Sequence, residues 1–189
     1  MKIVALIPAH LKSIRFPNKI LLKIHGLEMV EHVRRRAVMS GLFESVYVAT
    51  GDEEIISVIK SHNGSYIKTK KKHLSGSSRV IEAIKSLDAN VTHIVLIQGD
   101  EPLVLPSYLK KMCERIIENP DIDAWNVTSE LINKSQLSEH SIVKCAINEE
   151  ERILYCFRNA PSFSSFDIQK SYVKKILGLI AFKKETILN

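Results

Sequence analysis

The stretch Ile94-Val-Leu-Ile-Gln-Gly-Asp-Glu-Pro102 decides how this chain folds. Its apolar half predicts a buried strand, and the glycine and proline that follow predict a sharp turn where that strand ends. In an open α/β sheet, ligands bind just beyond the carboxyl ends of the strands. Asp100 and Glu101 therefore stand where a metal or a polar substrate is expected, although Asp-Glu-Pro is also an ordinary polar turn.

Strands and helices alternate through the first part of the chain. Continuous apolar runs predict strands, and apolar residues at helical spacing predict helices. This β–α–β alternation predicts a mainly parallel sheet with helices on both faces. The predicted strands cover 2–7, 45–49, 66–67 and 92–97, and the predicted helices cover 29–40, the segment from Asp52 to Gly64, the segment from a cap at Ser77 or Ser78 through Leu87, and 106–118.

After Ile122 the alternation gives way to a different rhythm. The predicted fold class is therefore α/β, with a Rossmann-like, mainly parallel sheet flanked by helices and then a mixed-sheet half. We expect a single domain over 1–189, with halves at 1–120 and 121–189, since no repeat or linker interrupts the sequence. The later strands are predicted at 122–130, 142–147, 152–157 and 173–182, with a short helix near 135–140.

Length and composition indicate a globular protein without a membrane span. A chain of 189 residues is long enough for one sizeable core, and 45% hydrophobic with 25% charged residues is ordinary for such a domain. No apolar run approaches the ~20 residues that a spanning helix needs, and the N-terminus lacks a secretory signal. We expect a cytoplasmic protein that does not insert into membranes. Its three cysteines, Cys113, Cys145 and Cys156, have no metal-ligand spacing and are expected to be idle thiols.

The net charge of +6 raises the alternative of a nucleic-acid partner. Single-strand binders interleave aromatic and basic residues, and the sequence shows no such stripe. Much of the positive charge lies at 12–19 and 68–72, which suits a cleft for a small, phosphate-rich ligand at least as well. We therefore expect no nucleic-acid partner, while Lys70-Lys71-Lys72 is equally well a solvated turn.

The loop after the first strand, Pro8-Ala-His-Leu-Lys-Ser-Ile-Arg-Phe-Pro-Asn-Lys19, is rich in cations. It contains no glycine, so it is neither a Walker loop nor a dinucleotide fingerprint. Arginine grips phosphate oxygens with two parallel hydrogen bonds, and lysine supplies a compact charge. Lys12, Arg15 and Lys19, with the hydroxyl of Ser13, therefore suit a triphosphate, and the alternative is a basic surface loop.

A set of short motifs is spread over nearly the whole chain. They are Ile7-Pro-Ala with Ser13, Arg15, Pro17 and Lys19; Val48-Ala-Thr50; His73-Leu-Ser-Gly76 with Arg79; Gln98-Gly-Asp-Glu-Pro102; Val143-Lys144; Leu154-Tyr155; Arg158; and Gly178. Together these motifs are far more specific than any one of them. In this order they resemble one family, the KDO cytidylyltransferases, which are CMP-sugar synthetases that activate 3-deoxy-manno-octulosonate (KDO).

The resemblance implies a fold of the nucleotide-diphospho-sugar transferase type and a Mg²⁺-dependent reaction between CTP and an acidic 2-keto sugar such as KDO. The anomeric hydroxyl of the sugar attacks the α-phosphate, pyrophosphate leaves, and the CMP-sugar serves surface polysaccharide and lipopolysaccharide synthesis. On this basis residues 1–120 form a CTP-binding half, and 121–189 form a sugar-binding and dimerisation half. A homodimer is the assembly that the resemblance implies.

The resemblance also implies a role for individual residues. Arg15, Lys19 and Asp100 form the catalytic set, and Asp100 binds the metal. Asp100 suits that role because Mg²⁺ prefers one or two carboxylates together with substrate phosphates. The nucleotide-binding residues are Pro8, Ala9, His10, Ser13, Arg15, Lys19, His73, Ser75 and Gly76, and the sugar-binding residues are Gln98, Tyr155 and Arg158.

The chain departs from the family pattern at several positions. His10 replaces an arginine, Gly51 and Ser78 replace acidic residues, and Ile176 replaces a sugar-contacting histidine. Family members also continue for some tens of residues beyond Asn189, with a second metal-binding aspartate and part of the dimer interface. We therefore expect a C-terminally shortened chain: either a fragment of a longer active protein, or a relative with weak or no activity.

Two further readings of function stay open beside the leading one. One alternative is a nucleotidyltransferase with a different nucleotide or sugar. His10 and Ile176 differ from the family at positions where the resemblance implies contact with a ligand. Alternatively it is a nucleotide- or sugar-binding module that kept the cleft and lost turnover. Mg²⁺-dependent release of pyrophosphate separates an enzyme from such a module.

Overall fold

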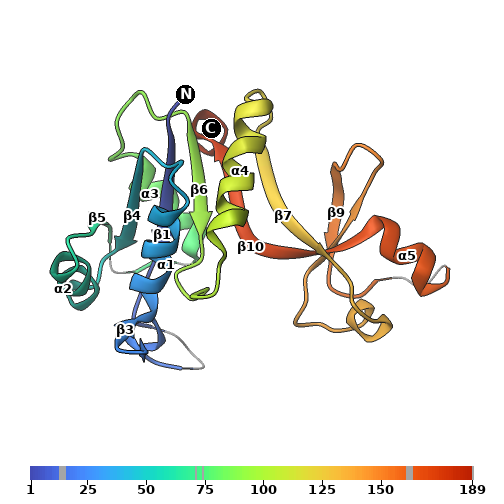
Figure 1. Cartoon of the computed structure of the whole chain (residues 1–189), viewed down its shortest axis with the longest axis horizontal. Helices are drawn as coiled ribbons and strands as arrows, with labels where there is room; N and C mark the ends of the chain where they lie inside the picture. Colours follow the sequence, from blue (N-terminus) through green and yellow to red (C-terminus); the bar gives the residue numbers. More distant parts are fainter. Residues whose placement is uncertain (13–15, 71, 74, 161–163, 189) are drawn as a thin grey trace. The chain divides into compact units, whose positions relative to one another are not determined.

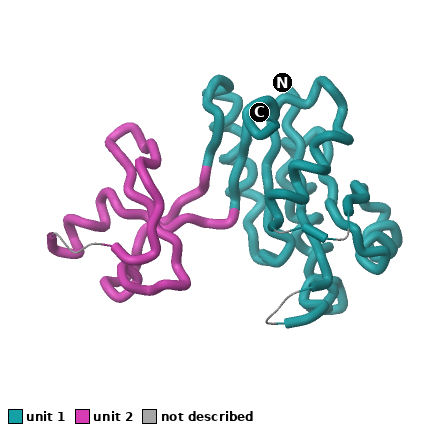
Figure 2. The backbone as a smooth tube through the Cα atoms, turned by 180° about the vertical axis from the view of Figure 1, so that it is seen from behind, with its two compact units in different colours: residues 1–125, 179–189 teal, residues 126–178 magenta. Residues whose placement is uncertain are grey.

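The computed structural model describes residues 1–12, 16–70, 72–73, 75–160 and 164–188. They form two compact units, one built from residues 1–125 and 179–189 and the other from 126–178 (Figure 2). The strands are β1 Ile3–Pro8, β2 Lys23–Ile24, β3 Leu27–Glu28, β4 Ser45–Thr50, β5 Ser65–Lys68, β6 His93–Ile97, β7 Ala124–Glu130, β8 Lys144–Ile147, β9 Ile153–Phe157 and β10 Val173–Lys183. The helices are α1 Met29–Met39, α2 Glu53–Ser61, α3 Gly76–Ile84, α4 Pro106–Glu118, α5 Phe166–Tyr172 and α6 Lys184–Leu188, with 3-10 turns η1 Lys19–Leu21 and η2 Lys134–Leu137.

The first unit is organised around a mainly parallel sheet (Figure 1). β1 lies between β4 and β6 and is parallel to both, and β5 extends the sheet beside β4. β1 and β6 are buried along their whole length, as their continuous apolar runs predict for central parallel strands. The end of β10 adds an antiparallel strand beside β6. The predicted α/β class with a mainly parallel sheet is confirmed.

The core on one face of this sheet is formed by α3. Alternate residues of β1, Val4 and Leu6, pack with Val80 and Ile84 of that helix, because successive side chains of a strand point to opposite faces. The cluster also contains Ile94 and Leu96 of β6 in the same alternation. This packing holds the middle and the end of α3 against the sheet.

The second unit contains β7, β8, β9 and the first part of β10, together with a small core. β8 pairs antiparallel with both β9 and the first part of β10, and β7 also pairs with β10. Its core consists of Leu131, Leu137 and Val173, packed against partly buried Phe157, Ala160 and Phe166. Parallel and antiparallel pairs are mixed in the eight-stranded sheet as a whole, whereas β8 pairs antiparallel with both of its neighbours.

β10 explains why the two units do not follow the predicted halves. Its residues 173–175 pair with β8, whereas 179–183 pair with β6. The last segment of the chain therefore belongs to the first unit, and the boundaries lie after residues 125 and 178 instead of after residue 120. Whether the chain acts as a single domain, with one half for CTP and the other for sugar, stays a prediction.

Several local predictions need correction. The cap of α3 is Ser75, not Ser77 or Ser78, because Ser75 Oγ accepts from Ser78 N at 3.1 Å while Ser78 Oγ accepts from Ser75 N at 3.3 Å. This reciprocal capping box starts the helix earlier, and it ends at Ile84 instead of Leu87. The elements η1, β2, β3, α5 and α6 were not predicted, and η2 replaces the helix expected at 135–140.

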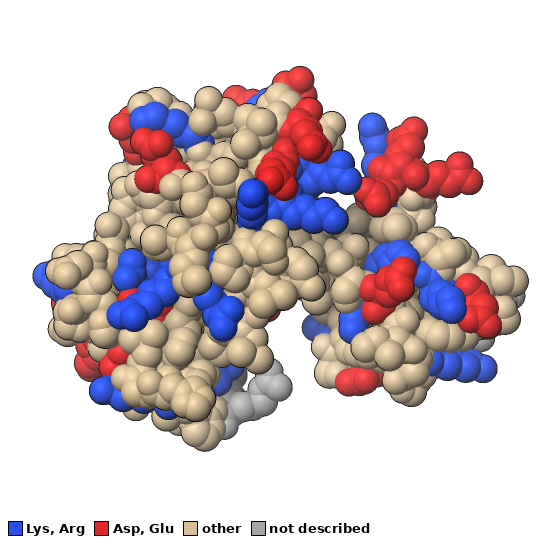
Figure 3. All heavy atoms as spheres, viewed as in Figure 1, with Lys and Arg blue, Asp and Glu red and all other residues tan. Residues whose placement is uncertain are grey.

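The surface carries charges of both signs. On the face drawn in Figure 3, Lys and Arg side chains are interspersed with Asp and Glu side chains. Interspersed charges weaken the long-range attraction for a polyanion that the net charge alone would suggest. Among the described residues, no helix is long and apolar enough to cross a membrane.

Candidate active site

The carboxyl ends of β1 and β6 meet at one edge of the sheet because these strands are parallel neighbours. A Cβ atom on Gly99 would lie 2.9 Å from the carbonyl oxygen of Pro8 and 3.0 Å from Cδ1 of Ile20. A side chain at this position would therefore collide with the end of β1, and only glycine allows the approach. The Gln-Gly-Asp turn thus brings Asp100 beside the loop that follows β1.

Lys19 and Asp100 form an ion pair at this edge. Lys19 Nζ lies 2.5 Å from Asp100 Oδ2, and the two side chains are 36% and 43% exposed. An ion pair this exposed contributes little to stability, so its interest is chemical. The structure brings together two members of the predicted catalytic set that stand 81 residues apart in the sequence.

The start of α3 approaches the same strand ends. A Cβ atom on Gly76 would lie 3.4 Å from Pro8 Cγ and 3.9 Å from Gln98 Oε1. Gly76 is the first residue of α3, and the amide groups of a helix N-terminus attract anions. Three predicted residues, Pro8, Gly76 and Gln98, therefore converge around a helix end that suits a phosphate or another polar group.

His73 lies against α3, with both of its ring nitrogens close to side chains of that helix. Its Nε2 lies 2.8 Å from Glu82 Oε2, and its Nδ1 lies 3.3 Å from Ser78 Oγ. Glu82 also accepts from the backbone nitrogen of Lys70 at 3.0 Å. His73 and Ser75 are thus both engaged in holding the first turns of α3, and their predicted contact with the nucleotide stays a prediction.

The loop after β1 is described at both ends. Ala9 is buried and donates its backbone N–H to Ala49 O at 2.9 Å, whereas His10 is exposed. Asn18, in a left-handed conformation with φ 58°, donates to Leu11 O at 3.0 Å and closes the loop. The predicted phosphate-binding residues Ser13 and Arg15 lie outside the described residues.

Asp52 is a residue of this site that the sequence analysis missed. Its Oδ2 accepts from the backbone N–H of Leu11 at 2.9 Å. We interpreted it as an acidic residue that opens a helix, although it lies shortly after the end of a predicted strand. The rule that ligand sites lie at the carboxyl ends of strands would have drawn attention to it.

The structure explains why glycine stands at position 51. A Cβ atom there would lie 2.6 Å from the carbonyl oxygen of Lys70 and 2.7 Å from that of Thr69. Real Cβ atoms do not approach backbone this closely, so no side chain fits. The acidic residue that the family resemblance implies at this position is excluded by the packing of the two strand ends.

Arg79 is a second residue whose part in the site was missed. It is buried, and its Nη1 donates to Thr69 Oγ1 at 2.6 Å and to Lys70 O at 3.0 Å. Burial lowers the pKa of the guanidinium, and the charges of Asp52 and Glu82 act in the opposite direction. Arg79 therefore links α3 to the end of β5 and stands in the electrostatic field of Asp52.

In the second unit, two cations hold one turn of the chain. Lys144 is fully buried, and its Nζ donates to the carbonyl oxygens of Glu139 at 2.7 Å and Ile142 at 2.9 Å. Arg158 Nη1 donates to the carbonyl oxygen of His140 at 2.6 Å. The predicted sugar-binding Arg158 is therefore anchored to the turn that Lys144 also supports.

Tyr155 is the other predicted sugar-binding residue of this unit. Its side chain is 56% exposed, and its ring lies 5.4 Å from that of Phe157 in a tilted arrangement. An exposed aromatic ring of this kind is available to a ligand, and its contact with a sugar stays a prediction.

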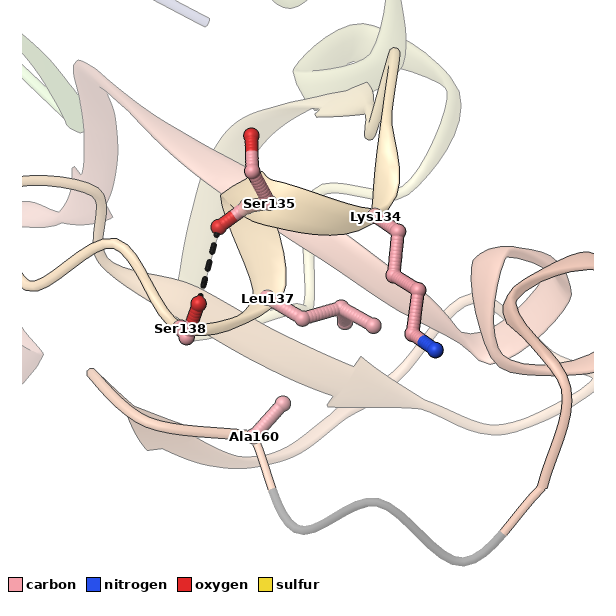
Figure 4. A pocket seen from close by; sticks show the side chains of 5 residues that line it. All are labelled: Lys134, Ser135, Leu137, Ser138 and Ala160. Atoms are coloured by element: carbon pink, nitrogen blue, oxygen red, sulfur yellow. Dashed lines mark hydrogen bonds between the residues drawn. The ribbon is translucent and has the colours of Figure 1, made fainter.

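A hollow of about 360 Å³ lies elsewhere in the second unit. In Figure 4 the side chains of Leu137 and Ala160 face each other, and Ser138 Oγ donates to Ser135 O at 3.1 Å. Its described lining is completed by Lys134 and includes none of the predicted site residues. The predicted chemistry therefore does not use this hollow.

Asp100 and Glu101 are the residues that could hold a metal. Burial, with a smaller contribution from the neighbouring Asp100 charge, raises the pKa of Glu101. The described residues contain no group of three or more His, Cys, Asp or Glu side chains placed to bind a metal ion. Two adjacent carboxyl groups nevertheless fit Mg²⁺, which completes its shell with water and substrate phosphates instead of a protein cage.

Comparison with known proteins gives one consistent result. The family model for cytidylyltransferases matches residues 4–186. The 3-deoxy-manno-octulosonate cytidylyltransferase of Flavobacterium johnsoniae is 32% identical over 192 residues, covering 100% of this chain and 78% of that protein. The 8-amino-3,8-dideoxy-manno-octulosonate cytidylyltransferase of Shewanella frigidimarina is 32% identical, covering 99% and 77%.

Solved structures agree with the sequence relatives. The structure of a CMP:2-keto-3-deoxy-manno-octonic acid synthetase complexed with CTP superimposes with a TM-score of 0.92 at 28% identity, covering 100% of this chain and 77% of that one. A 4-diphosphocytidyl-2C-methyl-D-erythritol synthase from Anaerococcus prevotii matches with a TM-score of 0.63 at 15% identity, which supports the fold alone.

Proposed function

Because the chain belongs to the cytidylyltransferase family, we propose that it transfers CMP from CTP to the anomeric hydroxyl of an acidic 2-keto sugar, with release of pyrophosphate. The sugar is KDO or a close relative of it, and the product serves lipopolysaccharide synthesis. The observation that carries the proposal is the relationship over the whole chain to cytidylyltransferases named for these sugars.

The chemistry needs little covalent help from the protein. A bond forms between the anomeric oxygen and the α-phosphorus, and the bond from that phosphorus to the pyrophosphate oxygen breaks. Alignment and charge neutralisation supply most of the catalysis in such transfers. Lys19 supplies a positive charge at the strand ends, and the N-terminus of α3 at Gly76 supplies amide dipoles beside it.

We propose that Asp100 holds Mg²⁺, with Glu101 as its neighbour. When bound, the ion would neutralise phosphate charge and favour departure of pyrophosphate. Lys19 would then be shared between Asp100 and the phosphates, because its ammonium group already contacts that carboxylate.

The sugar side of the reaction belongs to the second unit in this proposal. A carboxylate on the acceptor favours a planar guanidinium, and Arg158 is anchored through one of its nitrogens to His140 O. The 8-amino sugar is a second candidate acceptor, since the relative named for it is as similar, at 32% identity, as the relative named for KDO. A homodimer and a cytoplasmic location remain part of the proposal.

The reaction is tested by measuring pyrophosphate release by the purified protein with Mg²⁺. Each of the four nucleoside triphosphates would be combined with KDO or with its 8-amino analogue. We expect release with CTP and an acidic sugar only. Folded protein that binds CTP without releasing pyrophosphate would instead identify a binding module that has lost turnover.

Substitution of the ion pair tests the proposed roles of its members. Asp100→Asn should abolish Mg²⁺-dependent release, and Lys19→Ala should weaken CTP binding, while both variants keep the wild-type melting temperature because the pair is exposed. The matched control is Glu118→Gln, which breaks an exposed ion pair with Arg115 away from the site. Full activity of Asp100→Asn would refute the metal assignment.

A further inference from the structure

Asp52 occupies the N-cap position of α2 without capping it. Aspartate is favoured at this position because its carboxylate accepts from an amide of the first helical turn. Among the described residues, the Asp52 side chain makes no such bond, although the helix begins regularly with Ile56 N donating to Asp52 O at 3.1 Å. Its carboxylate instead accepts from Leu11, 41 residues earlier in the sequence. The side chain therefore serves a loop outside its own helix.

Leu11 is the point where the loop after β1 is fastened. Its N–H donates to Asp52 Oδ2 at 2.9 Å, and its carbonyl accepts from Asn18 N at 3.0 Å. Both backbone groups of Leu11 are thus engaged, one toward α2 and one across the base of the loop. Lys19 follows Asn18 directly in the sequence, and its ammonium group contacts Asp100. Because Asn18 is bonded to Leu11, a shift of Leu11 would also shift Lys19.

Asp52 is itself held firmly enough to act as an anchor. Its backbone N–H donates to Thr50 Oγ1 at 3.1 Å, and Thr50 is fully buried. Gly51 packs directly against the backbone of Lys70, which fixes the turn from β4 into α2. The charge of Asp52 acts to raise the pKa of buried Arg79, so the two groups lie within electrostatic reach of each other. A hydrogen bond to an ionised acceptor is roughly twice as strong as a neutral one.

We propose that Asp52 is a positioning residue for nucleotide transfer, which fixes the Leu11 amide and thereby the loop that presents Lys19 to the triphosphate. It acts through the loop and does not touch the reacting atoms. The kinetic consequence rests on the proposed cytidylyl transfer, whereas the fastening of the loop does not.

The test compares two substitutions with opposite properties. Asp52→Ser introduces another residue that is favoured at the N-cap position, but its side chain is too short to reach Leu11. Asp52→Asn keeps an acceptor oxygen at the same distance. In Asp52→Ser we expect hydrogen exchange of the Leu11 amide to accelerate about tenfold or more, and the KM and Kd for CTP to rise about tenfold. In Asp52→Asn both effects should be much smaller. The KM for the sugar should stay unchanged in both variants.

Two controls separate positioning from general stability. Glu54→Ser alters an acidic residue in the same first turn of α2 and should leave the Leu11 exchange and the CTP constants unchanged. The melting temperature of Asp52→Ser should stay near the wild-type value because serine is itself favoured at a helix N-cap. Calorimetric CTP binding requires no turnover, so it decides the role of Asp52 even if the wild type releases no pyrophosphate.

Specific outcomes would overturn the inference. Unchanged Leu11 exchange in Asp52→Ser would show that the carboxylate does not hold the loop. Faster exchange with unchanged CTP affinity and KM would show that the loop is not positioned for the nucleotide. Wild-type protein that binds CTP but releases no pyrophosphate would contradict the proposed reaction, while the CTP affinities of the Asp52 variants would still test the positioning role.

Discussion

A single residue, Lys144, places a positive charge in the protein interior, where polar groups have to replace its hydration. Lys144 is fully buried, and the partners described for its ammonium group are the carbonyl oxygens of Glu139 and Ile142. Burial lowers the pKa of this lysine, because the charged form loses its hydration. Carbonyl dipoles and the nearby charge of Glu139 partly replace that hydration, so Lys144 stabilises the turn to which Arg158 is also bonded.

We predict that Lys144→Met destabilises the protein by about 1–3 kcal/mol, since two carbonyl groups lose their donor. The Arg158 guanidinium should then be held less firmly, and the KM for the acidic sugar should rise more than the KM for CTP. Urea unfolding and steady-state kinetics measure the two effects. Lys110→Met, at an exposed lysine of α4, is the control. Equal stability of both variants would contradict a supporting role for Lys144.

At the scale of elements, the strand ends of the first unit approach each other more closely than side chains allow. The turn between β4 and α2 packs on the end of β5 through Gly51, and the turn after β6 packs on the end of β1 through Gly99. Glycine at these two positions is a requirement of packing. The same close approach gathers the loops at one edge of the sheet.

Gly51→Ala should therefore lower the free energy of unfolding by about 1–3 kcal/mol, the cost typical of overpacking. The new Cβ atom would lie 2.6 Å from the carbonyl oxygen of Lys70, and backbone has to shift to admit it. Gly76→Ala is the matched control, because its Cβ atom would lie at an ordinary 3.4 Å from Pro8. Thermal unfolding of both variants makes the comparison, and an undisturbed Gly51→Ala protein would contradict the packing argument.

β9 exposes apolar side chains to solvent in the isolated chain. It pairs with β8, and Ile153, Leu154 and Tyr155 are 38%, 61% and 56% exposed. An exposed apolar edge strand is a template for association with another chain. This exposure supports the proposed homodimer.

We predict that Leu154→Lys shifts the protein toward the monomer in sedimentation experiments, because a charge on β9 disfavours burial of the strand. Leu103→Lys, at an apolar residue of the first unit that is 80% exposed, should leave the association unchanged. Identical sedimentation of both variants and the wild type would exclude β9 as the contact surface.

At the scale of the whole molecule, His93 couples stability to pH. It is the first residue of β6, is 3% exposed, and its Nε2 lies 3.3 Å from Pro120 O. Burial lowers its pKa, the Pro120 carbonyl opposes the shift, and the charges of Lys183 and the N-terminus reinforce it, with Glu185 opposing. The unfolded chain therefore binds this proton more readily than the folded protein.

The free energy of unfolding should accordingly fall as the pH drops below about 6.5, the ordinary pKa of histidine, and the His93 contribution should be constant above it. His93→Gln should show a weaker decline between about pH 6.5 and pH 5, although it is less stable at neutral pH. Urea unfolding across this range measures the slope, with His140→Gln at an exposed position as control. Equal slopes in His93→Gln and wild type would refute the assignment.

The regular elements follow from local pattern. The helix predicted at 106–118 has the same bounds in the structure, and the central strands differ from prediction by one or two residues. Their apolar periodicity is determined by which face meets the core, and that information lies within each segment. The two-residue strands β2 and β3 are too short to show a period, although the positive φ angles of His25 and Gly26 mark their turn.

The α/β class, the order of the main elements and the family could therefore be predicted from the sequence, because apolar periodicity and motif spacing are properties of the linear chain. Tertiary structure alone decided that Asp52 serves Leu11 instead of its own helix, and that Lys144 is buried against carbonyl groups. The contact between Lys19 and Asp100 also arises only when parallel strands bring their carboxyl ends together. Partners of this kind lie tens of residues apart, and their distance depends on how strands pair and loops close, which no local pattern encodes.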